Sequence, residues 1–190
     1  MKEIEILVKV NDGIEKCENK LKKYHFIEKK EVEDIYYYDP LRDSLKPNNK
    51  NEINQCMRLR KKEGKVYITY KIDNFDDNNI WLYSDEYETE VKNFDTMKNI
   101  IELLGLNELL TIHNKKSIYK SDKYEIALEE VKELGLFLEV EYCTGEDVDV
   151  KRVKNDIQDF IDKLDLDVSE ELHIGKPEMI LNNKKNEKEI

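Results

Sequence analysis

Residues 3–10, EIEILVKV, place an aliphatic side chain at every second position. As a β-strand, this segment has Ile4, Ile6, Val8 and Val10 on one face. The opposite face carries Glu3, Glu5, Leu7 and Lys9. Two carboxylates that close together on one face repel each other, so a solvent-exposed face more often mixes the signs of its charges. The charged face therefore needs a partner other than water.

The same alternation recurs in later segments that are rich in β-forming residues. Their charged faces carry Arg58 and Arg60 in MRLR, Lys71 in YITYK, Glu86, Glu88 and Glu90 in EYETE, Lys116 in NKK, Glu129 in ALEEV, and Glu139 and Glu141 in FLEVE. One such strand in a Glu-rich chain is usually a solvated face. Repetition on several strands instead favours a shared charged interior.

The pattern predicts an α+β fold that is mainly β. We expect a closed eight-stranded antiparallel β-barrel, a tunnel, with helices packed on the outside over the apolar strand faces. Strands are expected at 3–10, 26–38, on both arms of a hairpin within 55–72, and at 83–91, 111–120, 123–131 and 136–142. Helical periodicity follows Asp12 and Asp95, the expected helix caps, and returns between 150 and 164. We expect one domain over residues 1–181 and a polar tail over 182–190.

The formal net charge of -11 excludes nonspecific binding to nucleic acid or to a membrane surface, because both require a basic field. No signal peptide and no apolar run of membrane-spanning length is evident. The three cysteines, Cys17, Cys56 and Cys143, are widely spaced and odd in number, which is typical of reduced thiols. These features favour a cytoplasmic protein.

Charged side chains inside the barrel must be paired with each other, hydrated or bound to a ligand, since burying an isolated charge costs several kcal/mol. Arginine and lysine suit phosphate oxygens. Clustered carboxylates suit a hard divalent cation, Mg²⁺ or Mn²⁺. Both sets in one tunnel predict a metal-bound polyphosphate as the ligand.

These segments resemble the CYTH superfamily, also called the triphosphate tunnel metalloenzymes. The resemblance is carried by the opening E-x-E, by DIYYYD with Asp34 and Tyr36, and by MRLR, TYK, ETE, NKKSIY and the closing LEEVKELGLFLEVE. The chain departs from the family pattern at four positions. Leu7 and Asn114 replace lysines, Lys116 replaces an arginine, and Glu129 replaces an aspartate.

The resemblance implies roles for individual residues. Binding of the phosphate chain is expected at Lys9, Arg58, Arg60, Lys71 and Lys116. Metal ligation is expected at Glu3, Glu5, Glu88, Glu90, Glu129, Glu139 and Glu141. Catalysis is expected at Glu5, Lys9 and Glu139.

Three functions fit these expectations. The first is a metal-dependent phosphohydrolase acting on tripolyphosphate or an organic triphosphate such as thiamine triphosphate or ATP. The second is a class IV-type adenylate cyclase, and the third is a non-catalytic module that binds polyphosphate or nucleotide. The expected partner is a small triphosphate, and a homodimer is one option for the oligomeric state.

Overall fold

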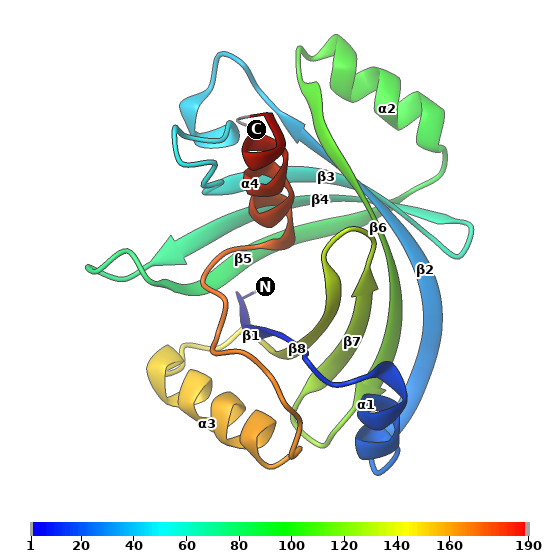
Figure 1. The fold of residues 1–190 in the computed structure, drawn as a ribbon. Helices are drawn as coiled ribbons and strands as arrows, with labels where there is room; N and C mark the ends of the chain where they lie inside the picture. The colour runs from blue at the N-terminus through cyan, green and yellow to red at the C-terminus, as the bar shows by residue number, and fades with distance from the viewer. Residues whose placement is uncertain (1, 189–190) are drawn as a thin grey trace.

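A computed structural model describes residues 2–188, and its strands close into an antiparallel barrel (Figure 1). The strands are β1 (Lys2–Lys9), β2 (His25–Tyr38), β3 (Gln55–Lys62), β4 (Lys65–Phe75), β5 (Trp81–Val91), β6 (Asn107–Lys120), β7 (Glu125–Val131) and β8 (Gly135–Thr144). Their order around the barrel is β1-β5-β4-β3-β2-β6-β7-β8. The predicted eight-stranded antiparallel tunnel is therefore confirmed.

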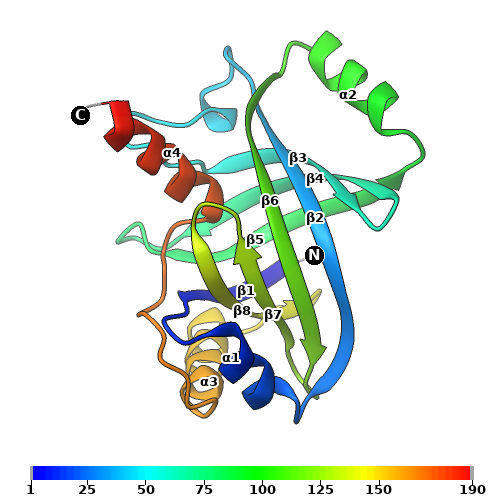
Figure 2. The same cartoon turned by 45° about the vertical axis from the view of Figure 1, so that its right-hand side comes forward.

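Closure depends on β1, which pairs with β8 along its whole length but with β5 only at its start. In that short junction Lys2 lies opposite Asp85 and Glu3 lies opposite Ser84. The long strands β2 and β6 pair along nearly their full length and run from one end of the molecule to the other (Figure 2).

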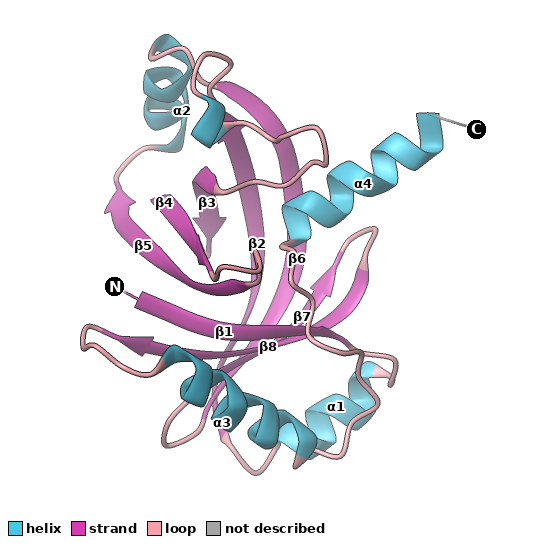
Figure 3. Cartoon of the chain, turned by 90° about the vertical axis from the view of Figure 1, so that its left-hand side faces the viewer, coloured by secondary structure: helices cyan, strands magenta, loops and turns pink. Residues whose placement is uncertain are grey.

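Helices cover the outside of the barrel, as the apolar strand faces require. They are α1 (Ile14–Leu21), α2 (Phe94–Leu103), α3 (Val150–Asp162) and α4 (Lys176–Lys188), and a short 3-10 helix spans Asp43–Leu45. Figure 3 shows α1 and α3 on the same side of the barrel, below β1 and β8. No helix among residues 2–188 is long and apolar enough to cross a membrane.

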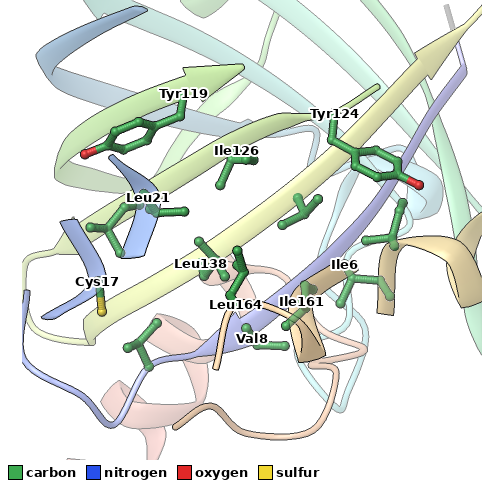
Figure 4. Packing of buried hydrophobic residues seen from close by; sticks show 14 of the residues in the cluster. Ile6, Val8, Cys17, Leu21, Tyr119, Tyr124, Ile126, Leu138, Ile161 and Leu164 are labelled. Carbon is green, nitrogen blue, oxygen red and sulfur yellow. The ribbon is translucent and has the colours of Figure 1, made fainter. Parts of the chain in front are cut away.

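The largest apolar cluster lies between α1, α3 and the outer faces of β1, β7 and β8 (Figure 4). Ile6 and Val8 from β1 pack there with Leu138 from β8 and Ile161 from α3. This packing confirms that the aliphatic face of EIEILVKV points outward. Its charged face must then point into the barrel, because side chains alternate along a strand.

The caps of the first two helices differ from expectation. Asn93, not Asp95, caps α2, because its side chain accepts a hydrogen bond from the backbone N–H of Thr96. Gly13 occupies the cap position of α1. Asp12 instead accepts hydrogen bonds from the Lys16 side chain and from the backbone of Asp167.

Helix α4 was not predicted, and residues 182–188 of the expected polar tail belong to it. Residues 189 and 190 of that tail lie outside the described residues. The first turns of α4 touch the barrel, where Ile180 is buried in a cluster with Leu7 and Tyr36. The rest of α4 is polar, so its sequence carries no apolar stripe at helical spacing.

Candidate active site: a charged tunnel

The barrel encloses a central cavity of about 210 Å³. Its charged lining comprises Glu3, Glu5, Lys30, Arg58, Arg60, Lys62, Lys71, Glu86, Glu88, Lys116, Glu125, Glu139 and Glu141. Nearly all of them lie on strand faces opposite the outer apolar clusters. The alternation in the sequence therefore becomes one continuous charged interior.

One wall of the cavity is basic and comes from β3. Arg60 donates two hydrogen bonds to the Asp34 carboxylate, from Nε at 2.7 Å and from a terminal nitrogen at 2.9 Å. The two arginines together hold the pKa of Asp34 well below its usual range, against the effect of burial. Asp34 therefore stays ionised and fixes Arg60 as a rigid cation.

Arg58 is buried and more loosely held. It donates to the Thr69 hydroxyl at 3.3 Å and lies 3.5 Å from a carboxylate oxygen of Glu88. Its Nε has no hydrogen-bond partner among the described residues. An unsatisfied buried N–H is costly, so this guanidinium is suited to an anionic ligand in the cavity.

Lys71 links the basic wall to the acidic one. Its ammonium group lies 2.7 Å from a carboxylate oxygen of Glu3 and 3.5 Å from one of Glu86. Burial alone would lower the pKa of Lys71, but the carboxylates of Glu5, Glu3 and Glu86 raise it well above its ordinary value. Lys71 is therefore a permanent cation in the middle of the tunnel.

The acidic wall comes from β1 and β8, which lie side by side. Glu5 is directly opposite Glu141 in the strand register. Carboxylate oxygens of Glu5, Glu139 and Glu141 lie within 4.8 Å of one another, so they can hold one metal ion. Oxygen-only ligands at this spacing suit Mg²⁺ or Mn²⁺.

Burial and crowding among the carboxylates of the acidic wall raise the pKa values of two of them. Burial, with repulsion from Glu139, Glu141 and Glu3, raises the pKa of Glu5 to about 8, although Lys71 opposes the shift. Burial, with repulsion from Glu141 and Glu86, raises the pKa of Glu3 to about 7, again against Lys71. A divalent cation would relieve this repulsion, so the residues present fit a metal.

Glu139 differs because cations surround it. Despite burial, Lys176 and Lys116 hold the pKa of Glu139 well below its ordinary value. The ammonium group of Lys176 lies 2.7 Å from Glu139 and 2.9 Å from Glu129, and Lys116 forms a further ion pair with Glu129. Helix α4 thus enters the charged network of the tunnel through its first residue.

A second cavity of about 180 Å³ lies toward α4 and shares Glu5, Lys71 and Glu139 with the first. Its other walls include Tyr36, Trp81, and residues 173–178. The centre of the tunnel therefore continues toward an end with aromatic side chains in its wall.

The structure brings most of the predicted site residues together. The central cavity is lined by Glu3, Glu5, Arg58, Arg60, Lys71, Glu88, Lys116, Glu139 and Glu141. Three predicted residues do not line it, and they are Lys9, Glu90 and Glu129.

Each of these three residues has a physical reason for its position. Lys9 has the correct strand parity but is exposed at the last position of β1, beyond the cavity. Glu90 is exposed and lies 3.5 Å from Lys65. Glu129 is fully buried between lysines, so its carboxylate is already compensated.

The sequence reasoning missed Lys30 and Glu125, which line the central cavity. It also missed Lys176 and Cys143, which contact the cavity carboxylates Glu139 and Glu141. Lys176 lies in a helix that the sequence pattern did not reveal. Cys143 shares the parity of Glu139 and Glu141 on β8, so that alternation could have identified it. Its thiol donates to Glu141 at 2.5 Å.

This fold and site define a tunnel protein that holds an anionic ligand beside a cluster of carboxylates. A family model described as "CYTH domain" matches residues 1–173. This chain belongs to that family. The family is metal-dependent in general, and its members include enzymes.

Individual relatives agree with this assignment. A protein of Methanocaldococcus jannaschii named "Putative adenylate cyclase" is 31% identical over 168 residues, covering 87% of this chain and 91% of the relative. The PH1819 protein from Pyrococcus horikoshii has a TM-score of 0.80 and 24% identity, covering 95% of this chain and 99% of that one. A structure from Hippeastrum, described as a "putative adenylyl cyclase" with "a dominant" triphosphatase activity, has a TM-score of 0.58 and 14% identity, with coverages of 88% and 90%.

Proposed function

We propose that this protein is a divalent-metal-dependent phosphohydrolase that acts on a triphosphate, either tripolyphosphate or an organic triphosphate. One observation carries the proposal: the cations Arg58, Arg60 and Lys71 face the carboxylates of β1 and β8 across a single cavity. Arginine and lysine bind phosphate oxygens, and the carboxylates bind the metal.

The metal would be held by Glu5, Glu139 and Glu141, with Glu3 beside them. When bound, Mg²⁺ or Mn²⁺ would neutralise phosphate charge and increase the acidity of a nearby water molecule. The buried Glu5 supports this assignment, because its carboxylate converges with those of Glu139 and Glu141. Glu88 lies nearer the basic wall, where it accepts a hydrogen bond from Thr69.

The chain's own residues then have distinct roles. Arg58 and Lys71 bind and orient the phosphate chain, and Arg60 does the same from its fixed position on Asp34. Glu5, whose pKa is raised, accepts the proton of the attacking water, and Glu139 helps to orient that water. The water oxygen forms a bond to the terminal phosphorus, the bond to the bridging oxygen breaks, and orthophosphate leaves with the shortened chain.

The chain lacks lysine at positions 7 and 114, but other cations supply positive charge to the tunnel. Lys30 and Lys62 also line the central cavity, and Lys176 reaches the network from α4. Asn114 donates to Glu129 at 3.2 Å, beside that ammonium group. These cations support binding of a highly charged triphosphate.

The second candidate is a class IV-type adenylate cyclase, which the name of the Methanocaldococcus jannaschii relative favours. In that reaction the ribose 3′-hydroxyl of ATP attacks the α-phosphorus, and pyrophosphate leaves. The Hippeastrum protein, described with a dominant triphosphatase activity, is a reason to place hydrolysis first. A fold alone does not decide between the two chemistries.

Product analysis distinguishes these functions. The protein is incubated with ATP, tripolyphosphate or thiamine triphosphate in Mg²⁺ or Mn²⁺, and products are separated by chromatography. Orthophosphate with the shortened chain supports the phosphohydrolase, and cyclic AMP with pyrophosphate supports the cyclase. Binding without turnover would leave the non-catalytic module. Arg58→Ala should reduce turnover strongly, whereas Lys61→Ala on the outer face of β3 is the matched control.

A further inference from the structure

The central cavity contains two further lysines, Lys30 from β2 and Lys62 from β3. Lys62 occupies the next inward position of β3 after Arg58 and Arg60. The side chain of Lys30 is only 8% exposed and forms an ion pair with Glu28. The ammonium group of Lys62 lies 3.6 Å from the same carboxylate oxygen of Glu28. Because the two lysines share one carboxylate, the pair keeps a net positive charge.

A third lysine adds to this crowding of positive charge. In the register of β2 and β6, Lys30 lies directly opposite Lys116. Like charges directly opposite on neighbouring strands destabilise a sheet. Burial lowers the pKa of Lys30, and the neighbouring Lys62 adds to the shift, although Glu28 opposes it. An anion bound between the three lysines would relieve this repulsion.

The lysine pair also extends the row of cations beyond the length of a triphosphate. In the register of β3 and β4, Lys71 lies opposite Cys56. From Cys56 to Lys62 an extended strand covers about 20 Å. Arg58 and Arg60 occupy the inward positions between these two ends. An extended triphosphate is shorter than this row, because only two bridging oxygens separate its first phosphorus atom from its last.

We propose that Lys30 and Lys62, together with Lys116, form a further phosphate subsite that binds the fourth phosphate of a linear inorganic polyphosphate. This inference rests on the proposed function, which places the terminal, reacting phosphate at the carboxylates of β1 and β8. The chain then runs past Arg58 and Arg60 to the lysines. Lys62 also lines a groove of about 910 Å³ beside the turn between β3 and β4, so this end of the tunnel has room for a longer chain.

Calorimetry with inorganic tripolyphosphate and tetrapolyphosphate tests the subsite. The metal-free protein is used, so that metal-dependent hydrolysis does not consume either probe. The parent should bind tetrapolyphosphate at least about tenfold more tightly than tripolyphosphate, because the fourth phosphate gains charged hydrogen bonds. In Lys30→Met/Lys62→Met this ratio should fall below about threefold, while the affinity for tripolyphosphate changes much less than the affinity for tetrapolyphosphate.

The matched control is Lys29→Met/Lys61→Met, which removes the same charge from neighbouring positions of the same two strands. Lys29 and Lys61 lie on the outer face, where they pair with Glu18 and Glu33. This control should keep the tenfold preference, because a loss of distant charge weakens the binding of both chains alike. Lys30→Arg/Lys62→Arg retains both charges and should keep the preference as well.

Three results would overturn the inference. They are equal affinities of the parent for the two chains, a loss of the preference in the Lys29→Met/Lys61→Met control, and equal weakening of both chains in Lys30→Met/Lys62→Met. Product analysis with Mg²⁺ or Mn²⁺ separates this inference from the proposed function. A preference for tetrapolyphosphate without hydrolysis of either chain would refute the proposed function and leave the subsite standing. Hydrolysis of tripolyphosphate without that preference would do the reverse.

Discussion

Replacement of Lys176 by methionine tests the contact between α4 and the tunnel most directly. The side chain is largely buried, and its ammonium group contacts both Glu129 at 2.9 Å and Glu139 at 2.7 Å. Methionine keeps much of the length and apolar volume but removes the charge. Two buried carboxylates then lose a cation, and Glu129 has no exposed surface through which water could replace it.

The magnitude follows from the cost of breaking a buried ion pair, which is about 3–5 kcal/mol. Lys116 still compensates Glu129, so the lower end of this range, about 3 kcal/mol, is expected for Lys176→Met. For a chain of this size that loss corresponds to a melting temperature lower by about 6–12 °C. Thermal unfolding of the metal-free protein, followed by circular dichroism at neutral pH, measures it.

The control is Lys184→Met, the same change at an exposed position of the same helix. It should leave the melting temperature nearly unchanged. Mn²⁺ should stabilise Lys176→Met more than the parent, because Glu139 no longer has its ammonium partner and is free to bind the ion. Equal melting temperatures for the two variants in metal-free buffer would refute the role of Lys176 in anchoring α4.

Three further outcomes are expected. Arg58→Ala should weaken tripolyphosphate binding by about 1.5–3 kcal/mol in calorimetry, and an unchanged affinity would remove Arg58 from the site. The metal-free protein should lose stability as pH rises from about 4.5 to about 8, because unfolded Glu5 releases its proton near 4.5 while folded Glu5 keeps it until about 8. In Glu5→Gln that slope should be shallower, and an equal slope in urea unfolding at several pH values would contradict the assignment. Leu7→Lys restores the family pattern at the position opposite Glu139 and should increase turnover, whereas Lys9→Ala should not change turnover. Steady-state rates of both variants test this, and a large loss of turnover in Lys9→Ala would show that Lys9 acts in the tunnel.

Much of the barrel was predictable because the period of a strand is two. In EIEILVKV the positions of Ile4 and Ile6 determine which face is apolar, and hence where Glu3 and Glu5 point. The same reasoning placed Arg58 correctly. Face assignment is a local property, so it can be made from a short stretch of sequence without any long-range contact.

Depth along the tunnel is not a local property. Lys9 has the parity of Glu5, yet it lies exposed at the end of β1 because the strand ends there. Glu129 points inward as expected, and Lys116 faces it across the β6–β7 hairpin, but its second lysine, Lys176, comes from α4, far away in sequence. A carboxylate that is enclosed by cations differs in function from a carboxylate that faces an open cavity. Only the assembled barrel decides in which of these two environments a given carboxylate lies.

The alternation by itself therefore determined the closed sheet, its charged interior and most of the residues that face it. The tertiary structure alone decided that Lys176 joins them, because one buried turn of a polar helix leaves no periodic signal in the sequence. It also decided that Cys143 meets Glu3 and Glu141, since that meeting depends on the register between the first strand and the last. Register between distant strands is fixed by the packing of the whole barrel, which no single segment encodes.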